Sequence, residues 1–137
     1  MKTVLVVYWS MSGNTELMAK KISEGADADL FTIDEISPEE ALKYDKIAFG
    51  CPSMGDEFEE GEEFYQWYQN LEYQLDGKKI AIFGSYGWGS GEWMEDWEER
   101  LEEAGYDLFE EALMVNEAPG PQEEEDCFNF GKRFKDY

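Results

Sequence analysis

Histidine is absent from the 137-residue sequence, and cysteine occurs only twice, as Cys51 and Cys127. Without histidine the chain cannot carry a Ser-His-Asp triad, a histidine general base or a zinc site that needs imidazole ligands. The two cysteines are far apart and form no C-x-x-C pair, which argues against a disulfide scaffold and a metal site. Cys51 ends an apolar segment and Cys127 lies beside Phe128 and Phe130, so both thiols are expected in or beside the core.

Basic residues are scarce: the chain has 11 Lys and Arg against 33 Asp and Glu, a formal net charge of −22. Phosphate backbones and anionic lipid surfaces attract clustered Lys and Arg, so this balance argues against nucleic acid and membrane partners. It favours a protein partner with a basic face, approached by electrostatic steering.

No apolar stretch approaches the ~20 residues that a membrane-spanning helix needs. The apolar run Val4–Trp9 is too short for the core of a secretory signal, and no small-residue cleavage site follows it, so we expect a cytoplasmic protein. The length predicts one domain over residues 1–137. Aromatic residues make up 16% of the chain, which indicates a folded core rather than an acidic disordered tail.

Five segments have the apolar, β-branched composition of buried strands: 4–9, 30–33, 46–51, 79–83 and an irregular one within 108–115. Helical patterns alternate with them. One carries Leu17, Met18 and Ile22, a short one starts at Pro38 behind the N-cap Ser37, and others span 62–75, 93–104 and 123–135. Strands that alternate with helices predict an α/β fold, in which right-handed crossovers place helices on both faces of a parallel sheet.

Three loops rich in glycine and small residues follow strands, at 10–15, 52–61 and 84–91. Ligands of open parallel sheets bind beyond the carboxyl ends of the strands, so these loops are the candidate site. The first loop, Ser10-Met11-Ser12-Gly13-Asn14-Thr15, precedes a helix whose free N–H groups favour an anion. Its three hydroxyls and one amide predict a phosphate held by neutral donors, although an ordinary capped turn uses the same residue types. The Walker and dinucleotide patterns are both missing, which weakens ATP and NAD as ligands.

The third loop places Tyr86 and Trp88 among glycines, so their rings can lie across a flat ligand. Trp93 and Trp97 are one turn apart in a helical pattern and are predicted to pack in the core.

These three loops together resemble those of flavodoxins, of the short-chain type found in anaerobic bacteria. Residues 10–15 match the family's phosphate loop, Ser53-Met54-Gly55-Asp56-Glu57 the loop on one side of the flavin, and Gly84-Ser85-Tyr86-Gly87-Trp88-Gly89 the loop on the other. The resemblance covers essentially the whole chain. It implies a flavodoxin-like, doubly wound three-layer sandwich whose five-stranded parallel sheet has the order 2-1-3-4-5. It also implies non-covalently bound FMN and one-electron transfer at low potential by a monomer, rather than enzymatic turnover.

The resemblance also implies roles for single residues. Ser10 to Thr15 would bind the FMN phosphate, with Ser12 where threonine is usual and Met11 in a variable position. Trp88 and Met54 would pack on the two faces of the flavin ring, Glu57 would contact the ring N3–H, and the backbone from Ser85 to Gly91 would border the pyrimidine end. The Gly55–Asp56 peptide would turn over on reduction and accept a hydrogen bond from the flavin N5–H, which stabilises the neutral semiquinone. Glycine at position 55 would ease a turn with positive φ.

Acidic residues concentrate around the second and third loops: Asp56, Glu57, Glu59, Glu60, Glu62 and Glu63, then Glu92, Glu95, Asp96, Glu98 and Glu99. Most of them fit solvated helix faces. As a hypothesis, they also steer the basic docking face of a redox partner, such as a ferredoxin-type partner, toward the flavin edge.

Three other functions compete with the electron carrier. A small FMN-dependent oxidoreductase, similar to a quinone reductase, would need a further substrate pocket for which 137 residues leave little chain. A signalling receiver domain needs an acceptor aspartate where this chain has Gly50-Cys51-Pro52-Ser53, and is rejected. A flavin-free acidic interaction module would leave Trp88 and the phosphate-type loop unexplained.

Overall fold

A computed structural model of the protein describes residues 2–87 and 89–137. Its strands are β1 (Val4–Tyr8), β2 (Asp29–Thr32), β3 (Lys46–Gly50), β4 (Lys79–Tyr86), β5 (Asp107–Leu108) and β6 (Leu113–Asn116). The sheet runs in the order β2-β1-β3-β4-β5, β6 also pairs with β4, and all of these pairs are parallel. The predicted α/β sandwich with strand order 2-1-3-4-5 is confirmed.

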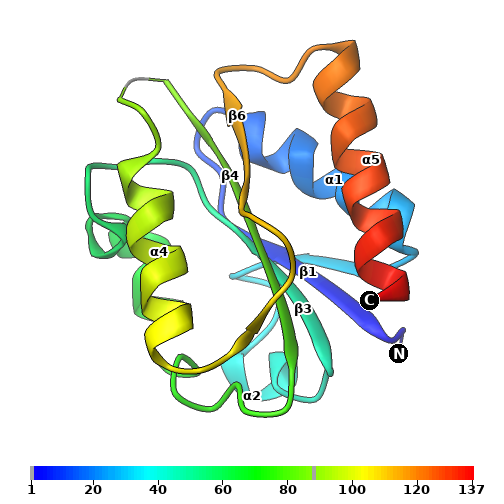
Figure 1. Ribbon diagram of the computed structural model, residues 1–137, viewed down its shortest axis with the longest axis vertical. Coiled ribbons are helices and arrows are strands. Elements are labelled where there is room, and N and C mark those ends of the chain that lie inside the picture. The colour runs from blue at the N-terminus through cyan, green and yellow to red at the C-terminus, as the bar shows by residue number, and fades with distance from the viewer. Residues whose placement is uncertain (1, 88) are drawn as a thin grey trace.

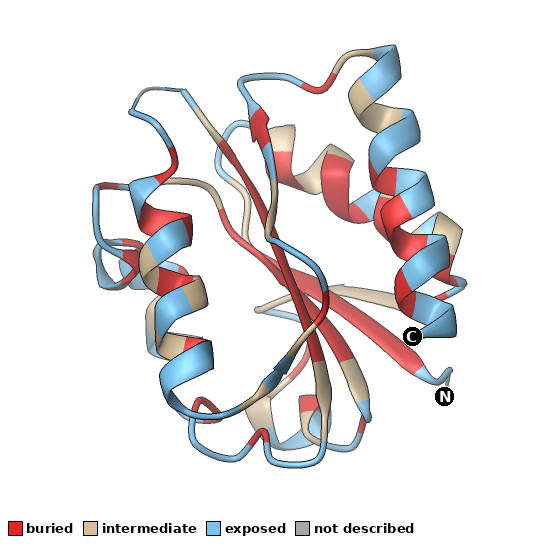
Figure 2. Cartoon of the chain, viewed as in Figure 1, coloured by how far each residue is buried: buried red, intermediate tan, exposed pale blue. Residues whose placement is uncertain are grey.

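The central strands are buried on both faces (Figure 2). In β1, successive side chains point to opposite faces of the sheet. Val4, Val6 and Tyr8 join one core, and Leu5 and Val7 join the other. A run of apolar residues without polar alternation is therefore what this position requires.

Helices cover both faces of the sheet. α1 (Asn14–Ala26) and α5 (Pro121–Asp136) pack together on one side, with α4 (Glu92–Glu103) on the other (Figure 1). α3 (Glu62–Tyr68) and the 3-10 turn η1 (Phe58–Glu60) share the core of α4, and the short α2 (Pro38–Ala41) joins β2 to β3. Gly25 and Gly131 allow α1 and α5 to approach closely, because a Cβ on either would overlap a backbone carbonyl of the other helix.

Three local predictions are confirmed in detail. Ser37 caps α2, where its hydroxyl oxygen accepts a hydrogen bond from the Glu40 N–H at 3.2 Å. Trp93 and Trp97 are buried in the core under α4. Cys51 is buried in the same core, and Cys127 is buried in the core on the other face of the sheet. Within residues 2–87 and 89–137, no helix combines the length and apolar character needed to cross a membrane.

The helix predicted over 62–75 ends earlier, at Tyr68. Turns follow it, in which the Leu71 N–H bonds the Tyr68 carbonyl and the Gln74 N–H bonds the Leu71 carbonyl. Leu71 and Leu75 are nevertheless buried, so the turns place these two side chains in the core as a helix would have done. The turns direct Glu72 inward, where it pairs with Arg100 on α4.

The fifth strand is irregular, as expected, and divides into β5 and β6. β5 pairs with the start of β4 and β6 with its end. Between them the Phe109 N–H still bonds the Ile80 carbonyl of β4 at 2.7 Å, and its ring packs against Phe130 and Phe134 of α5. Glu110 then takes a positive φ of 49°.

Candidate functional site

The three predicted loops meet at the carboxyl ends of β1, β3 and β4, and Ser85 joins them. Its carbonyl accepts a hydrogen bond from the Ser53 N–H at 2.9 Å, and its hydroxyl lies 2.7 Å from the Thr15 hydroxyl. Ser85 belongs to β4 rather than to a loop, as do Gly84 and Tyr86. Gly84 serves packing, since a Cβ there would overlap the Cys51 carbonyl. The third loop proper therefore begins at Gly87.

The first loop wraps around the Ser10 side chain. The Ser10 hydroxyl oxygen accepts hydrogen bonds from the N–H groups of Gly13 and Glu16, each at 3.2 Å. A hydroxyl has two acceptor positions and one proton, so the Ser10 proton stays available to an external acceptor. Gly13 caps α1 with a φ of 95°, which only glycine adopts at little cost. The loop thus forms a capped turn and also keeps donors for an anion.

Two other polar groups of this loop have internal partners. The Ser12 hydroxyl accepts a hydrogen bond from the Asn14 N–H at 3.4 Å. Thr15 is buried, and its hydroxyl bonds Ser85, so it stabilises the site from inside. Met11, by contrast, is 67% exposed and offers an apolar surface at the mouth of the site.

Tyr8 fixes the position of the negatively charged Glu16 carboxylate near the first loop. Its hydroxyl donates a hydrogen bond to the Glu16 carboxylate at 2.9 Å. Burial, together with this bond to Glu16, raises the pKa of Tyr8 to about 12. Tyr8 therefore stays protonated and keeps Glu16 in a fixed position in the first turn of α1.

The second loop is stabilised by its own side chains. The Ser53 hydroxyl donates a hydrogen bond to the Gly55 carbonyl at 3.3 Å. Gly55 does not have the positive φ that the turn was expected to use, and the Glu60 carboxylate occupies the space a Cβ would need. The hydrogen bond from Ser53 favours the backbone orientation seen here. Met54 is 42% exposed, and Asp56 and Glu57 are exposed.

Before the glycines of the third loop, the last residue of β4, Tyr86, has an anchored aromatic ring. The Tyr86 ring packs against Trp93 at 5.7 Å between centroids, so it is partly committed to the core rather than free to cover a ligand. Gly87 and Gly89 are exposed, and Gly91 caps α4 with a φ of 92°. The Glu92 carboxylate accepts a hydrogen bond from the Ser90 N–H at 2.6 Å, which lowers the pKa of Glu92. Trp88 lies outside the described residues.

Residues of all three predicted loops line one cavity of about 190 Å³. It is lined by Met11, Ser12, Asn14, Pro52, Ser53, Met54, Ser85, Tyr86, Gly87 and Glu117. Of the predicted site residues that the structure describes, Ser10, Gly13, Thr15, Gly55, Asp56, Glu57, Gly89 and Gly91 do not line it. These residues support or flank the residues that line the cavity.

Two residues near the cavity were not anticipated. Glu117 lines it, and Trp9 lines a neighbouring cavity of about 170 Å³ that shares Met11 and Met54 with the first. Both residues directly follow strands, β6 and β1, at their carboxyl ends. The rule that identified the three loops could have identified these positions too.

The residues present fit a flat ligand that carries an anionic group. Neutral donors and a helix N-terminus lie at one end, and the exposed Met11 and Met54 offer apolar surface beside them. Cys51, at the end of β3, takes no part: burial raises the pKa of its thiol to about 12.

Comparison with known proteins identifies the family and the fold. The sequence pattern of the flavodoxin family fits residues 6–131. A flavodoxin of Clostridium beijerinckii is 41% identical over 133 residues, covering 93% of this chain and 96% of that protein. A flavodoxin of Megasphaera elsdenii is 41% identical over 121 residues, covering 85% and 88%. The solution structure of two-electron reduced M. elsdenii flavodoxin has a TM-score of 0.84 and 35% identity, covering 98% of this chain and 99% of that one.

The family pattern spans most of the chain, and the relatives match it over nearly their full lengths. The resemblance noted in the three loops is confirmed: the chain belongs to the flavodoxin family, whose members are FMN-binding electron carriers.

Proposed function

We propose that this protein is a low-potential, one-electron carrier with non-covalently bound FMN, and that it works in the cytoplasm as a single-domain monomer. The convergence of the three loops on Ser85, around one cavity, is the observation that carries this proposal. FMN supplies the redox chemistry, and the protein sets its potential through hydrogen bonds, stacking and charge.

The phosphate of FMN belongs at the first loop. The Ser10 proton, the Ser12 hydroxyl, the Asn14 amide and the N-terminus of α1 give it neutral donors. None of residues 10–15 is Lys or Arg, so affinity for the phosphate rests on hydrogen bonds rather than ion pairing. Thr15, with its hydroxyl bonded to Ser85, holds this loop against β4.

The ring of FMN belongs between the second and third loops. Met54 would pack on one face and Trp88 on the other, Glu57 would accept from N3–H, and the backbone of Ser85 to Gly91 would border the pyrimidine end. The exposure of Met54 and Glu57 supports these roles, which come from the family pattern.

The Gly55–Asp56 peptide would control the semiquinone. In the orientation seen here the Gly55 carbonyl accepts a hydrogen bond from Ser53. We propose that the peptide turns over on reduction and offers this carbonyl to the flavin N5–H, so the neutral semiquinone gains a hydrogen bond. The carboxylates around the site then disfavour further reduction to an anion and lower the second potential.

Partner proteins would dock on the acidic surface around the site. Glu57, Glu62, Glu95 and Glu99 are all exposed there. We propose that they attract the basic face of ferredoxin-type partners. Other acids predicted for this role have structural partners instead: Asp96 accepts from the Phe58 N–H, and Glu98 accepts from the Ala112 N–H.

FMN and riboflavin titrations into flavin-free protein test the proposal, with flavin fluorescence as the readout. We expect FMN to bind much more tightly than riboflavin, which lacks the phosphate. Ser10→Ala should weaken FMN about tenfold, as loss of a hydrogen bond to a charged group does. Ser23→Ala, whose hydroxyl bonds within its own helix, is the matched control. Equal affinity for FMN and riboflavin would refute the phosphate site.

The neighbouring cavity gives the quinone reductase-like alternative a place for a second flat substrate, although three glutamates line it beside Trp9, Met11 and Met54. Its test is steady-state turnover of NADH or NADPH with benzoquinone by the FMN-loaded protein. We expect no turnover above that of free FMN, and a saturable rate would favour the enzyme instead.

A further inference from the structure

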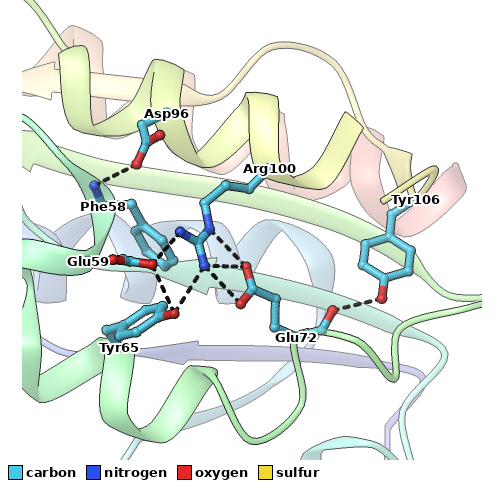
Figure 3. Close-up of polar contacts among 7 residues, drawn as sticks. All are labelled: Phe58, Glu59, Tyr65, Glu72, Asp96, Arg100 and Tyr106. Atoms are coloured by element: carbon cyan, nitrogen blue, oxygen red, sulfur yellow. Dashed lines mark hydrogen bonds and ion pairs between the residues drawn. The ribbon is translucent and has the colours of Figure 1, made fainter. Parts of the chain in front are cut away.

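Helix α4 adjoins the two loops proposed to flank the flavin ring. It begins at Glu92, directly after the third loop, and one side of it faces η1, directly after the second loop (Figure 3). The residues that make this contact, Asp96, Trp97 and Arg100, have the spacing of one helix face.

Phe58, the first residue of η1, is fixed to α4 twice. Its N–H donates a hydrogen bond to the Asp96 carboxylate at 2.9 Å. Its buried ring stacks on Trp97, with centroids 4.3 Å apart and an angle of 13° between planes. The backbone one residue after Glu57 is therefore fixed in position.

Glu59, the next residue, is bound by Arg100. The guanidinium donates to the Glu59 carboxylate at 2.9 Å and to the Tyr65 hydroxyl at 3.1 Å, and that hydroxyl donates to Glu59 at 3.2 Å (Figure 3). The guanidinium also lies over the Phe58 and Tyr65 rings. Hydrogen bonds from Arg100 and Tyr65 lower the pKa of Glu59, so the pair stays charged.

Glu72 holds the guanidinium from the other side. Its carboxylate accepts two hydrogen bonds from Arg100, at 2.8 and 2.9 Å. The Glu72 side chain is only 6% exposed and that of Arg100 21%, whereas that of Glu59 is 51% exposed. Arg100 is thus oriented by a buried partner, and Glu59 is the exposed group that it binds.

We propose that Arg100 is a positioning residue for the second loop: through Glu59 it fixes residues 53–57 relative to α4 and the third loop, and so sets the gap that receives the flavin ring. This inference rests on the proposed role of residues 53–57 at FMN. The contact can reach the loop because η1 is a tight turn, in which the Glu60 N–H bonds the Glu57 carbonyl at 3.1 Å.

Amide hydrogen exchange in flavin-free protein tests the positioning by itself. Glu59→Gln removes the exposed charge and leaves the Arg100–Glu72 pair intact. We expect the amides of Phe58 and Glu60 to exchange at least fivefold faster in this variant. Glu110→Gln is the matched control, because Glu110 is likewise an exposed carboxylate that pairs with an arginine, Arg133 of α5, and it does not line the cavity. Unchanged exchange at both amides in Glu59→Gln would overturn the proposal.

FMN affinity tests the consequence for the site. We expect Glu59→Gln to weaken FMN binding about tenfold, and Glu110→Gln to change it less than twofold. Glu99→Gln removes one exposed charge beside Arg100 without touching Glu59, so it should not weaken binding. Equal weakening in Glu59→Gln and Glu99→Gln would contradict positioning and indicate a general charge effect. If the unaltered protein fails to bind FMN, the proposed function fails, while the exchange experiment still decides the Arg100 contact.

Discussion

The hydroxyl oxygens of Thr15 and Ser85 lie 2.7 Å apart in the protein interior, although 70 residues separate them in the sequence. Thr15 belongs to the first turn of α1 and Ser85 to the carboxyl end of β4. Since the Ser85 carbonyl also accepts from the Ser53 N–H, this one residue aligns all three loops of the candidate site. The site therefore depends on a buried polar contact that no single loop contains.

Ser85→Ala should destabilise the flavin-free protein by about 1–3 kcal/mol, because the buried Thr15 hydroxyl loses its partner. Urea unfolding at constant slope measures this change. Ser23→Ala, with a local hydrogen bond near the surface, should change the free energy of unfolding by less than about 0.5 kcal/mol. Equal effects of the two variants would show that the contact contributes nothing.

Tyr44 and Asp29 should give stability a defined pH dependence. The Tyr44 hydroxyl donates to the Asp29 carboxylate at 2.6 Å, and this bond lowers the pKa of Asp29. A lowered folded-state pKa contributes stability above the ordinary value, about 4, and that contribution is lost as the pH falls through the folded value. Tyr44→Phe should therefore cost about 1 kcal/mol at pH 7 and progressively less below about pH 4.

The same pair should lose its contribution to stability at high pH as well, this time as the pH rises. Burial, with the bond to Asp29, raises the pKa of Tyr44 to about 12. Its contribution is present below about pH 10, the ordinary value, and is lost as the pH rises toward 12. Urea unfolding of the unaltered protein and of Tyr44→Phe across pH 3–11 measures the difference between their free energies of unfolding. Repulsion among the other carboxylates is the same in both proteins and cancels from this difference. A difference that stays constant over the range would contradict this assignment.

Electron transfer to a basic c-type cytochrome should slow about tenfold or more between 10 and 300 mM NaCl, because salt screens the acidic docking surface. Removing the charges of Glu95 and Glu99 should slow it at low salt. The same change at Glu102 and Glu103, at the other end of α4, should have a smaller effect. A rate that hardly depends on salt would reject docking by charge.

Local sequence patterns predicted the fold well where the apolar residues of a pattern are the residues that the fold buries. The apolar runs of β1 and β3 and the Ser37 cap lie where expected. The helix over 62–75 was too long because apolar spacing cannot distinguish a helix from successive turns that bury the same residues. The pairing of Glu72, in the turns that follow the helix, with Arg100 is a contact between distant segments that no local pattern contains.

The candidate site was predicted by position at strand ends, and less well in its internal geometry. The first loop lies between β1 and α1, as expected, but the contact of Thr15 with Ser85 depends on tertiary structure. The sequence predicts Gly84 in the third loop, but it lies in β4 and makes room for the Cys51 carbonyl. The sequence does not single out Arg100, because its neighbours in sequence are helix-surface acids and its partners come from three other segments.

The most direct test of the central claim is stepwise anaerobic reduction of the FMN-loaded protein, followed by visible absorbance. A one-electron carrier with a stabilised neutral semiquinone should pass from yellow through a blue intermediate to colourless. Direct passage from yellow to colourless would contradict the one-electron account and the role of the Gly55–Asp56 peptide.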